Sequence, residues 1–181
     1  MPDDFASTAT TVDTLYRTHA PFIWRVARIR GIPVVNIPDI LQETFLTVLR
    51  RLSSYHEQGT IKGWLYTIAD GHIRLYFRSE GRRLRRMTHY AHMVPDGDES
   101  CQLEDRLRRS EATQLVQQFI EGLPESLREV FLLSCVEGLP GVEVARLLHL
   151  NINTFYGRER EARRRLHAFV ERTQVAPERS P

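Results

Sequence analysis

The chain has few of the residues that mark several common protein classes. Its 181 residues contain one lysine, Lys62, and two cysteines, Cys101 and Cys135, whose wide spacing argues against a disulfide framework. No run approaches the roughly 20 apolar residues that a membrane-spanning helix needs, and residues 1–11 lack a charged-then-apolar secretion signal. These absences favour a cytoplasmic protein that does not insert into a membrane.

The charges are unevenly distributed although the formal net charge is only +2 at pH 7. Arginines cluster at residues 78–86 and again at 158–165, and acidic residues gather between the clusters at 96–105. Two basic patches separated by an acidic stretch suit two DNA-contacting modules.

Hydrophobic periodicity is helical throughout, so the predicted fold class is all-α with two small domains. A polar segment broken by Pro95 and Gly97 is typical of a flexible linker. We therefore expect a first domain at 12–80, the linker at 81–105, a second domain at 106–172 and a disordered tail at 173–181.

The second domain contains a helix-turn-helix pattern. Leu123-Pro124 begins a helix that Gly138 stops, and a short helix follows at about 141–148. Asn151 is placed to cap a third, arginine-rich helix by accepting a backbone N–H of its first turn. In this motif the third helix enters a DNA major groove.

A projection of this third helix at about 100° per residue separates two faces. The apolar stripe consists of Phe155, Ala162, Leu166 and Phe169, and the opposite side of Asn153, Tyr156, Gly157, Arg160, Glu161 and Arg164. Gly157 costs about 1 kcal/mol against alanine inside a helix, which close approach of the backbone to DNA would explain. Glu159 falls on the apolar stripe, so either it pairs with an arginine or the helix is rotated. A solvated basic face is the alternative interpretation.

The first domain contains two further candidate surfaces. Asp39 begins a helix on which Gln42 and Glu43 share its face by their i, i+3 and i+4 spacing. A loop is expected from Tyr55 to Lys62. The next helix, from about 63 to 78, mixes aromatic residues with charged ones on the arc opposite its main apolar side: Tyr66, Ile73 and Phe77 with Asp70, Arg74 and Arg78. Such aromatics could stack on unpaired bases, or Tyr66 and Phe77 could pack on a neighbouring helix.

Together these segments resemble the sigma-70 family of bacterial transcription initiation factors, in its small two-domain extracytoplasmic-function group. Residues 39–45 (DILQETF) resemble the polymerase-binding helix of that family, and 63–69 (GWLYTIA) the start of its promoter-melting helix. The upstream-element domain is matched by Leu123-Pro124, 128–131 (REVF), Glu137-Gly138, Val144-Ala145, Asn153-Thr154, Arg158 and Ala162-Arg163.

The resemblance implies a non-enzymatic subunit without a cofactor, whose partners are core RNA polymerase, promoter DNA and a cognate anti-sigma factor. It implies polymerase contacts at Asp39, Gln42 and Glu43. It implies opening of the −10 element by Tyr55, Lys62, Trp64, Tyr66, Arg74, Phe77 and Arg78. It implies reading of the −35 element by Asn153, Thr154, Tyr156, Gly157, Arg158, Arg160 and Arg164.

The chain departs from residue types common in that family at four positions. Asparagine and aspartate are frequent where it has Gly71 and Leu75, and an apolar and a basic residue where it has Glu159 and Glu161.

Two other function classes are compatible with parts of the sequence. A stand-alone helix-turn-helix regulator accounts for the second domain but not for the first. A metal site could use only His89, His92 and Cys101, a spacing that matches closed zinc sites poorly.

Overall fold

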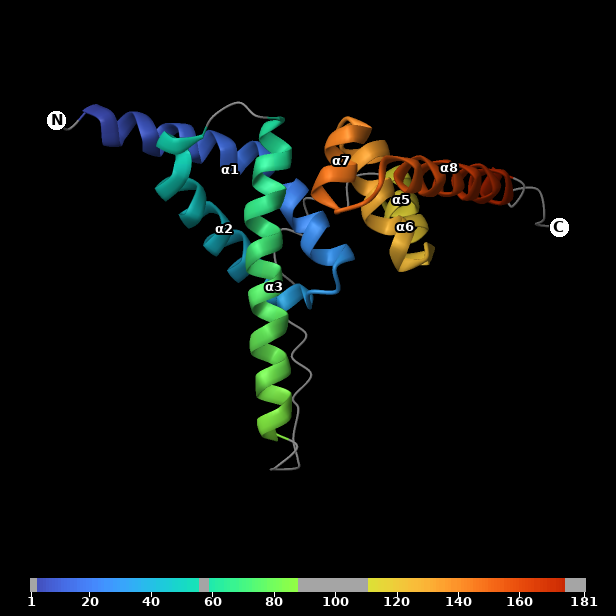
Figure 1. Ribbon diagram of the computed structural model, residues 1–181, viewed down its shortest axis with the longest axis horizontal. Coiled ribbons are helices and arrows are strands. Elements are labelled where there is room, and N and C mark those ends of the chain that lie inside the picture. The colour runs from blue at the N-terminus through green and yellow to red at the C-terminus, as the bar shows by residue number, and fades with distance from the viewer. Residues whose placement is uncertain (1–2, 56–58, 88–110, 175–181) are drawn as a thin grey trace. The chain divides into compact units, whose positions relative to one another are not determined.

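The computed structural model describes residues 3–55, 59–87 and 111–174, and every regular element in these ranges is a helix (Figure 1). The chain divides into an N-terminal unit, Met1–Glu104, and a C-terminal unit, Asp105–Pro181. The predicted all-α fold class is confirmed.

The N-terminal unit is built on three helices that contact one another pairwise. They are α1 (Asp3–Ile29), α2 (Ile37–Arg51) and α3 (Ile61–Met87), with the short 3-10 helices η1 (Val34–Asn36) and η2 (Leu52–Ser54) on either side of α2. Phe22, Val48 and Leu65, one from each long helix, are among the side chains fully buried in the core. Because α3 lies against both other helices, it has two buried sides along its first half.

The C-terminal unit begins with α5 (Glu111–Gly122) and α6 (Glu125–Val130), which continues into the π-helix η3 (Phe131–Val136). It ends with α7 (Gly141–Leu147) and the long α8 (Ile152–Gln174). The ring of Phe119 on α5 lies 5.0 Å from that of Phe131 and 5.4 Å from that of Phe169 on α8. These aromatic contacts join α5 to both η3 and α8.

The π-helix changes which side chains of this unit reach the core. The Glu137 backbone N–H donates to the Leu132 carbonyl, five residues back, at 2.9 Å, so this turn is wider than an α-helical one. Leu133, which a 3.6-residue projection places at the edge of the apolar face, is fully buried.

The turn of the helix-turn-helix is closed by backbone bonds and a cap. Leu150 N–H donates to the Ala145 carbonyl and His149 N–H to the Arg146 carbonyl, at 2.8 and 3.2 Å, with His149 at φ 53°. This is the pattern of a Schellman motif, with histidine where glycine is usual. The Asn151 side chain then accepts the backbone N–H of Asn153 at 2.8 Å, which confirms the predicted cap of α8.

Three expected boundaries differ in the structure. The helix that was expected to end near 78 continues to Met87, so the first residues of the expected linker are helical. α8 reaches Gln174. α3 begins at Ile61, which places Lys62 in its first turn rather than in a loop. The rest of the expected linker, with His89, His92 and Cys101, and the tail beyond 174 lie outside the described residues.

Candidate nucleic-acid interface

The outward face of α8 carries most of the residues expected to read the −35 element. Phe155 and Ala162 are buried against the unit, as the projection predicted. The opposite side is exposed at Asn153, Thr154, Tyr156, Gly157, Arg160 and Arg164, whereas Arg158 is half-buried. We call Asn153, Tyr156, Gly157, Arg160 and Arg164 the outward face of α8.

A close approach between α7 and α8 positions this face. A Cβ atom added to Gly141 would lie 2.5 Å from Cε1 of Phe155, whose ring is fully buried. Only glycine lets the start of α7 lie this near the ring. Sequence reasoning missed this requirement, because a glycine after Pro140 indicates only a turn. At Gly157, in contrast, an added Cβ meets no atom within 4 Å.

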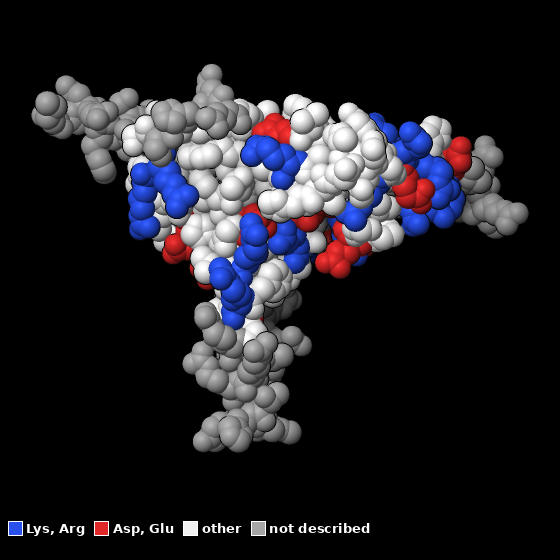
Figure 2. Space-filling model, viewed as in Figure 1, with Lys and Arg blue, Asp and Glu red and all other residues white. Residues whose placement is uncertain are grey.

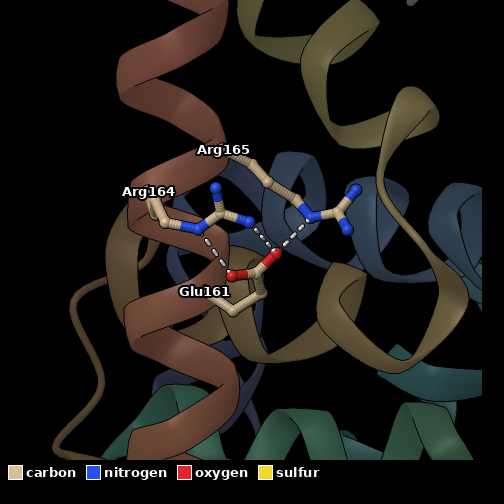
Figure 3. A network of polar contacts seen from close by, with 3 residues as sticks. All are labelled: Glu161, Arg164 and Arg165. Carbon is tan, nitrogen blue, oxygen red and sulfur yellow. Dashed lines mark hydrogen bonds and ion pairs between the residues drawn. The ribbon is translucent and has the colours of Figure 1, made fainter.

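Acid–arginine pairs border the outward face of α8 on both sides. Glu159 binds Arg163 at 3.0 Å, so it does pair with an arginine. Glu161 accepts bonds from Arg164 and Arg165 (Figure 3). Figure 2 shows the result at α8, where blue basic side chains alternate with red acidic ones. The helix is therefore less positive than its arginine content indicates.

The expected exposure of Tyr66 on α3 is wrong. Only 2% of Tyr66 is exposed, and Ile73 is fully buried. The reason is that α3 packs against both α1 and α2, so the second arc of its first half is also covered. Tyr66 and Ile73 belong to the core.

Exposed aromatic and basic residues do occur together further along α3. Phe77 is 43% exposed, and Arg74 and Arg78 are also exposed. The Phe77 ring meets that of Tyr76 edge-on at 5.5 Å, and the Tyr76 hydroxyl accepts a bond from the Asn36 amide at 2.8 Å. Phe77 is thus supported from one side and open on the other, as base stacking requires.

Buried Asp70 ties this part of α3 to the end of α1. Its carboxylate binds Arg30 at 3.0 Å and also pairs with Arg74 one turn further along α3. The Asp70–Arg74 ion pair therefore holds the Arg74 side chain near the contact between α1 and α3. Sequence reasoning placed Asp70 and Arg74 on one arc but could not foresee Arg30.

The start of α3 holds the remaining residues expected at the −10 element. Thr60 Oγ1 accepts the Gly63 N–H at 3.0 Å and caps the helix. The half-buried rings of Tyr55 and Trp64 have centroids 4.8 Å apart. The Lys62 ammonium lies 5.9 Å from the centre of the Phe22 ring, within the range of a cation–π contact. These residues are half-buried rather than fully presented to solvent.

The residues expected to bind polymerase share one exposed face of α2. Asp39, Gln42 and Glu43 are all exposed. Behind them Thr47 Oγ1 and His72 Nε2 of α3 lie 3.0 Å apart. Burial lowers the pKa of His72, while the nearby carboxylate of Glu43 acts in the opposite direction. The imidazole is therefore mostly neutral at pH 7, and His72 adds no full positive charge behind Glu43.

Residues 3–55, 59–87 and 111–174 contain neither a membrane-spanning helix nor a cluster of metal ligands. In these ranges no helix is long and apolar enough to cross a membrane. No three His, Cys, Asp or Glu side chains of the same ranges are grouped so that they could hold a metal ion.

Comparisons with known proteins match both units. The family model "Sigma-70 region 2" matches residues 15–83, and "Sigma-70, region 4" matches residues 113–166. The ECF RNA polymerase sigma-E factor of Haemophilus influenzae is 28% identical over 134 residues, which cover 71% of each chain. That of Escherichia coli K12 is 29% identical over 140 residues, covering 74% of this chain and 73% of the relative.

Two solved structures share the fold. The sigma factor RpoE in complex with the anti-sigma factor NepR, from Bartonella quintana, matches with a TM-score of 0.63 and 19% identity, over 88% of this chain and 96% of that one. CnrH in complex with the cytosolic domain of CnrY matches with a TM-score of 0.55 and 22% identity, over 92% and 94%. With both sigma-70 regions matched in order by family models and relatives, the chain belongs to the sigma-70 family, in its extracytoplasmic-function group.

Proposed function

We propose that this sigma factor acts in the cytoplasm by binding core RNA polymerase through the α2 face and directing it to promoters. In this proposal α8 reads the −35 element, and the exposed part of α3 helps to open the −10 element. The chain itself catalyses no step, because RNA synthesis belongs to the polymerase. The observation that carries the proposal is the outward face of α8, which a capped turn and a glycine-dependent contact position on the C-terminal unit.

Run-off transcription with core polymerase tests the whole proposal. Transcripts are expected from cognate promoters only when core enzyme and this chain are both present. If the chain binds a promoter duplex equally well without polymerase and adds no transcript, it is a stand-alone helix-turn-helix regulator instead.

The α2 face yields the first specific prediction. Changing Glu43→Lys together with Gln42→Ala should weaken binding to core polymerase by about 10-fold, or about 1.4 kcal/mol, because a charged contact is reversed. Both residues are exposed, so folding should change by no more than about 0.5 kcal/mol. Fluorescence titration with core enzyme gives the affinity, and circular dichroism checks the fold.

Glu171→Lys is a suitable control for this double variant. It reverses an exposed charge near the end of α8, in the other unit of the chain. Its affinity for core enzyme should match that of the wild type. Unchanged affinity in the α2 variant would show that polymerase binds elsewhere.

The outward face of α8 yields a second prediction. Arg160→Ala should cost about 1–3 kcal/mol at one base position if its guanidinium contacts a guanine. Arg165→Ala should instead weaken binding to all sequences and reduce the salt dependence by about one unit of slope. Two measurements separate these effects. Holoenzyme binding to −35 duplexes with single base changes gives the base preference, and binding at several salt concentrations gives the salt dependence. A uniform loss in Arg160→Ala would place this residue on the phosphate backbone.

A proteinaceous inhibitor is part of the proposal. The two solved structures described above are both complexes with a second protein, NepR with RpoE and CnrY with CnrH. By analogy we expect a cognate anti-sigma factor for this chain. Co-purification from the native cell followed by inhibition of run-off transcription would identify it.

A further inference from the structure

Glu161 lies at the border of the outward face of α8, and its carboxylate holds an arginine of that face. Arg164 Nε donates to Oε2 at 2.8 Å and Arg164 Nη2 to Oε1 at 2.7 Å. Arg165 Nε donates to the same Oε1 at 2.7 Å. One carboxylate therefore holds two guanidinium groups, one of them through two bonds (Figure 3).

The two bonds to Arg164 use only one side of its guanidinium. They involve Nε and one hydrogen of Nη2, so Nη1 and the second hydrogen of Nη2 remain on the other edge. Figure 3 shows Nη1 pointing away from the carboxylate. An arginine that contacts guanine O6 and N7 presents two such donors together. The edge that a guanine needs is thus left available, and the orientation of the group is already determined.

The charge balance argues against a simple phosphate-binding role for this cluster. Hydrogen bonds first from Arg164 and then from Arg165 lower the pKa of Glu161 to about 2, so the carboxylate stays ionised at any physiological pH. The three side chains then carry a net charge of about +1 rather than +2. A site that served only to neutralise phosphates would bind more strongly without the acid, so Glu161 needs another role.

We propose that Glu161 is a specificity-determining positioning residue, whose carboxylate holds the Arg164 guanidinium side-on so that its free edge reads one guanine of the −35 element. The proposal rests on the function proposed above, since it requires α8 to lie in the major groove of promoter DNA. It also gives a role to a carboxylate at a position where the family often has a basic residue.

Four variants in complete holoenzyme test the proposal: Glu161→Gln, Arg164→Ala, the two combined, and Glu159→Gln. The last is a matched control, because Glu159 pairs with Arg163 on the other border of the face. Selection from a library randomised at the −35 element first identifies the guanines that wild-type holoenzyme prefers. Competition binding with single-base variants then measures each preference.

We expect Arg164→Ala to lower the preference for one guanine by about 5-fold or more. Glu161→Gln should lower the preference for that same guanine, but less than Arg164→Ala does, because a neutral amide orients the guanidinium less firmly. The combined variant should lose no more than Arg164→Ala alone, since both act through one contact. Glu159→Gln should keep the wild-type preference.

Three results would overturn the proposal. If Glu161→Gln binds all sequences more tightly, with a steeper salt dependence and unchanged base preference, Glu161 only repels phosphates. If Arg164→Ala alters no base preference, Arg164 reads no base. If the losses of the two single variants add in full, they act independently. A wrong proposed function would give a different result, because wild-type holoenzyme would then show no base preference at the −35 element.

Discussion

Replacing Tyr66 with alanine is expected to destabilise the N-terminal unit by about 3–5 kcal/mol, the usual cost of removing a large aromatic side chain from a core. Only 2% of Tyr66 is exposed, and α3 is covered by two helices at this point. Both tryptophans, Trp24 and Trp64, lie in this unit. Their fluorescence during urea unfolding therefore reports its stability without interference from the C-terminal unit.

Phe77→Ala serves as the contrasting variant on the same helix. Phe77 is partly exposed, so the variant should stay folded, while the loss of a stacking ring should cost about 1–3 kcal/mol in promoter opening. Permanganate reactivity of thymines near the start site measures opening, and a pre-melted template should partly restore transcription. If Phe77→Ala opens promoters normally, the melting residues lie elsewhere in the N-terminal unit. A stable Tyr66→Ala variant would show that the core tolerates its loss.

Replacing Gly141 with alanine is expected to destabilise the C-terminal unit by about 1–3 kcal/mol, as overpacking of a filled core does. The new methyl group would lie 2.5 Å from Cε1 of Phe155, a residue that is only 1% exposed, so the buried ring would have to shift. Thermal unfolding followed by circular dichroism should show the loss, while tryptophan fluorescence stays unchanged. Binding to the −35 element should weaken as well, since Phe155 anchors α8.

Gly157→Ala is the matched control in the same unit. Its methyl group would lie in open space, and alanine should stabilise the helix by about 0.5–1 kcal/mol. The two glycines should thus respond in opposite directions to the same substitution. If Gly157→Ala gains stability but loses −35 affinity, the backbone of α8 approaches DNA closely at this residue. Equal destabilisation by both changes would contradict the packing assigned to Gly141.

Local sequence patterns were sufficient to predict a residue's structural role where that role depends on its neighbours in sequence. The cap at Asn151 and the stop at Gly138 follow from spacing alone and appear in the structure. The apolar stripe of α8 does so too, with Phe155 and Ala162 buried and Leu166 and Phe169 half-buried. The same holds for the shared exposed face of Asp39, Gln42 and Glu43 on α2. Each depends on the period of one helix, which the amino-acid order contains.

Helical projections predicted burial wrongly where a second helix covers a surface or where the helical period changes. Tyr66 projects onto a mixed arc of α3, but the position of α1 and α2 decides that this arc is buried. Leu133 lies in a π-turn, which is wider than an α-helical turn, and is fully buried. A projection of one helix at a constant angle contains neither fact.

The sequence by itself therefore determined the all-α class, the helix-turn-helix and the family of this protein, because helical periodicity and motif order are properties of the chain. Only the tertiary structure decided which aromatics remain open to unpaired bases and why Gly141 must be glycine. These depend on distances between side chains from different turns and different helices, and packing sets those distances.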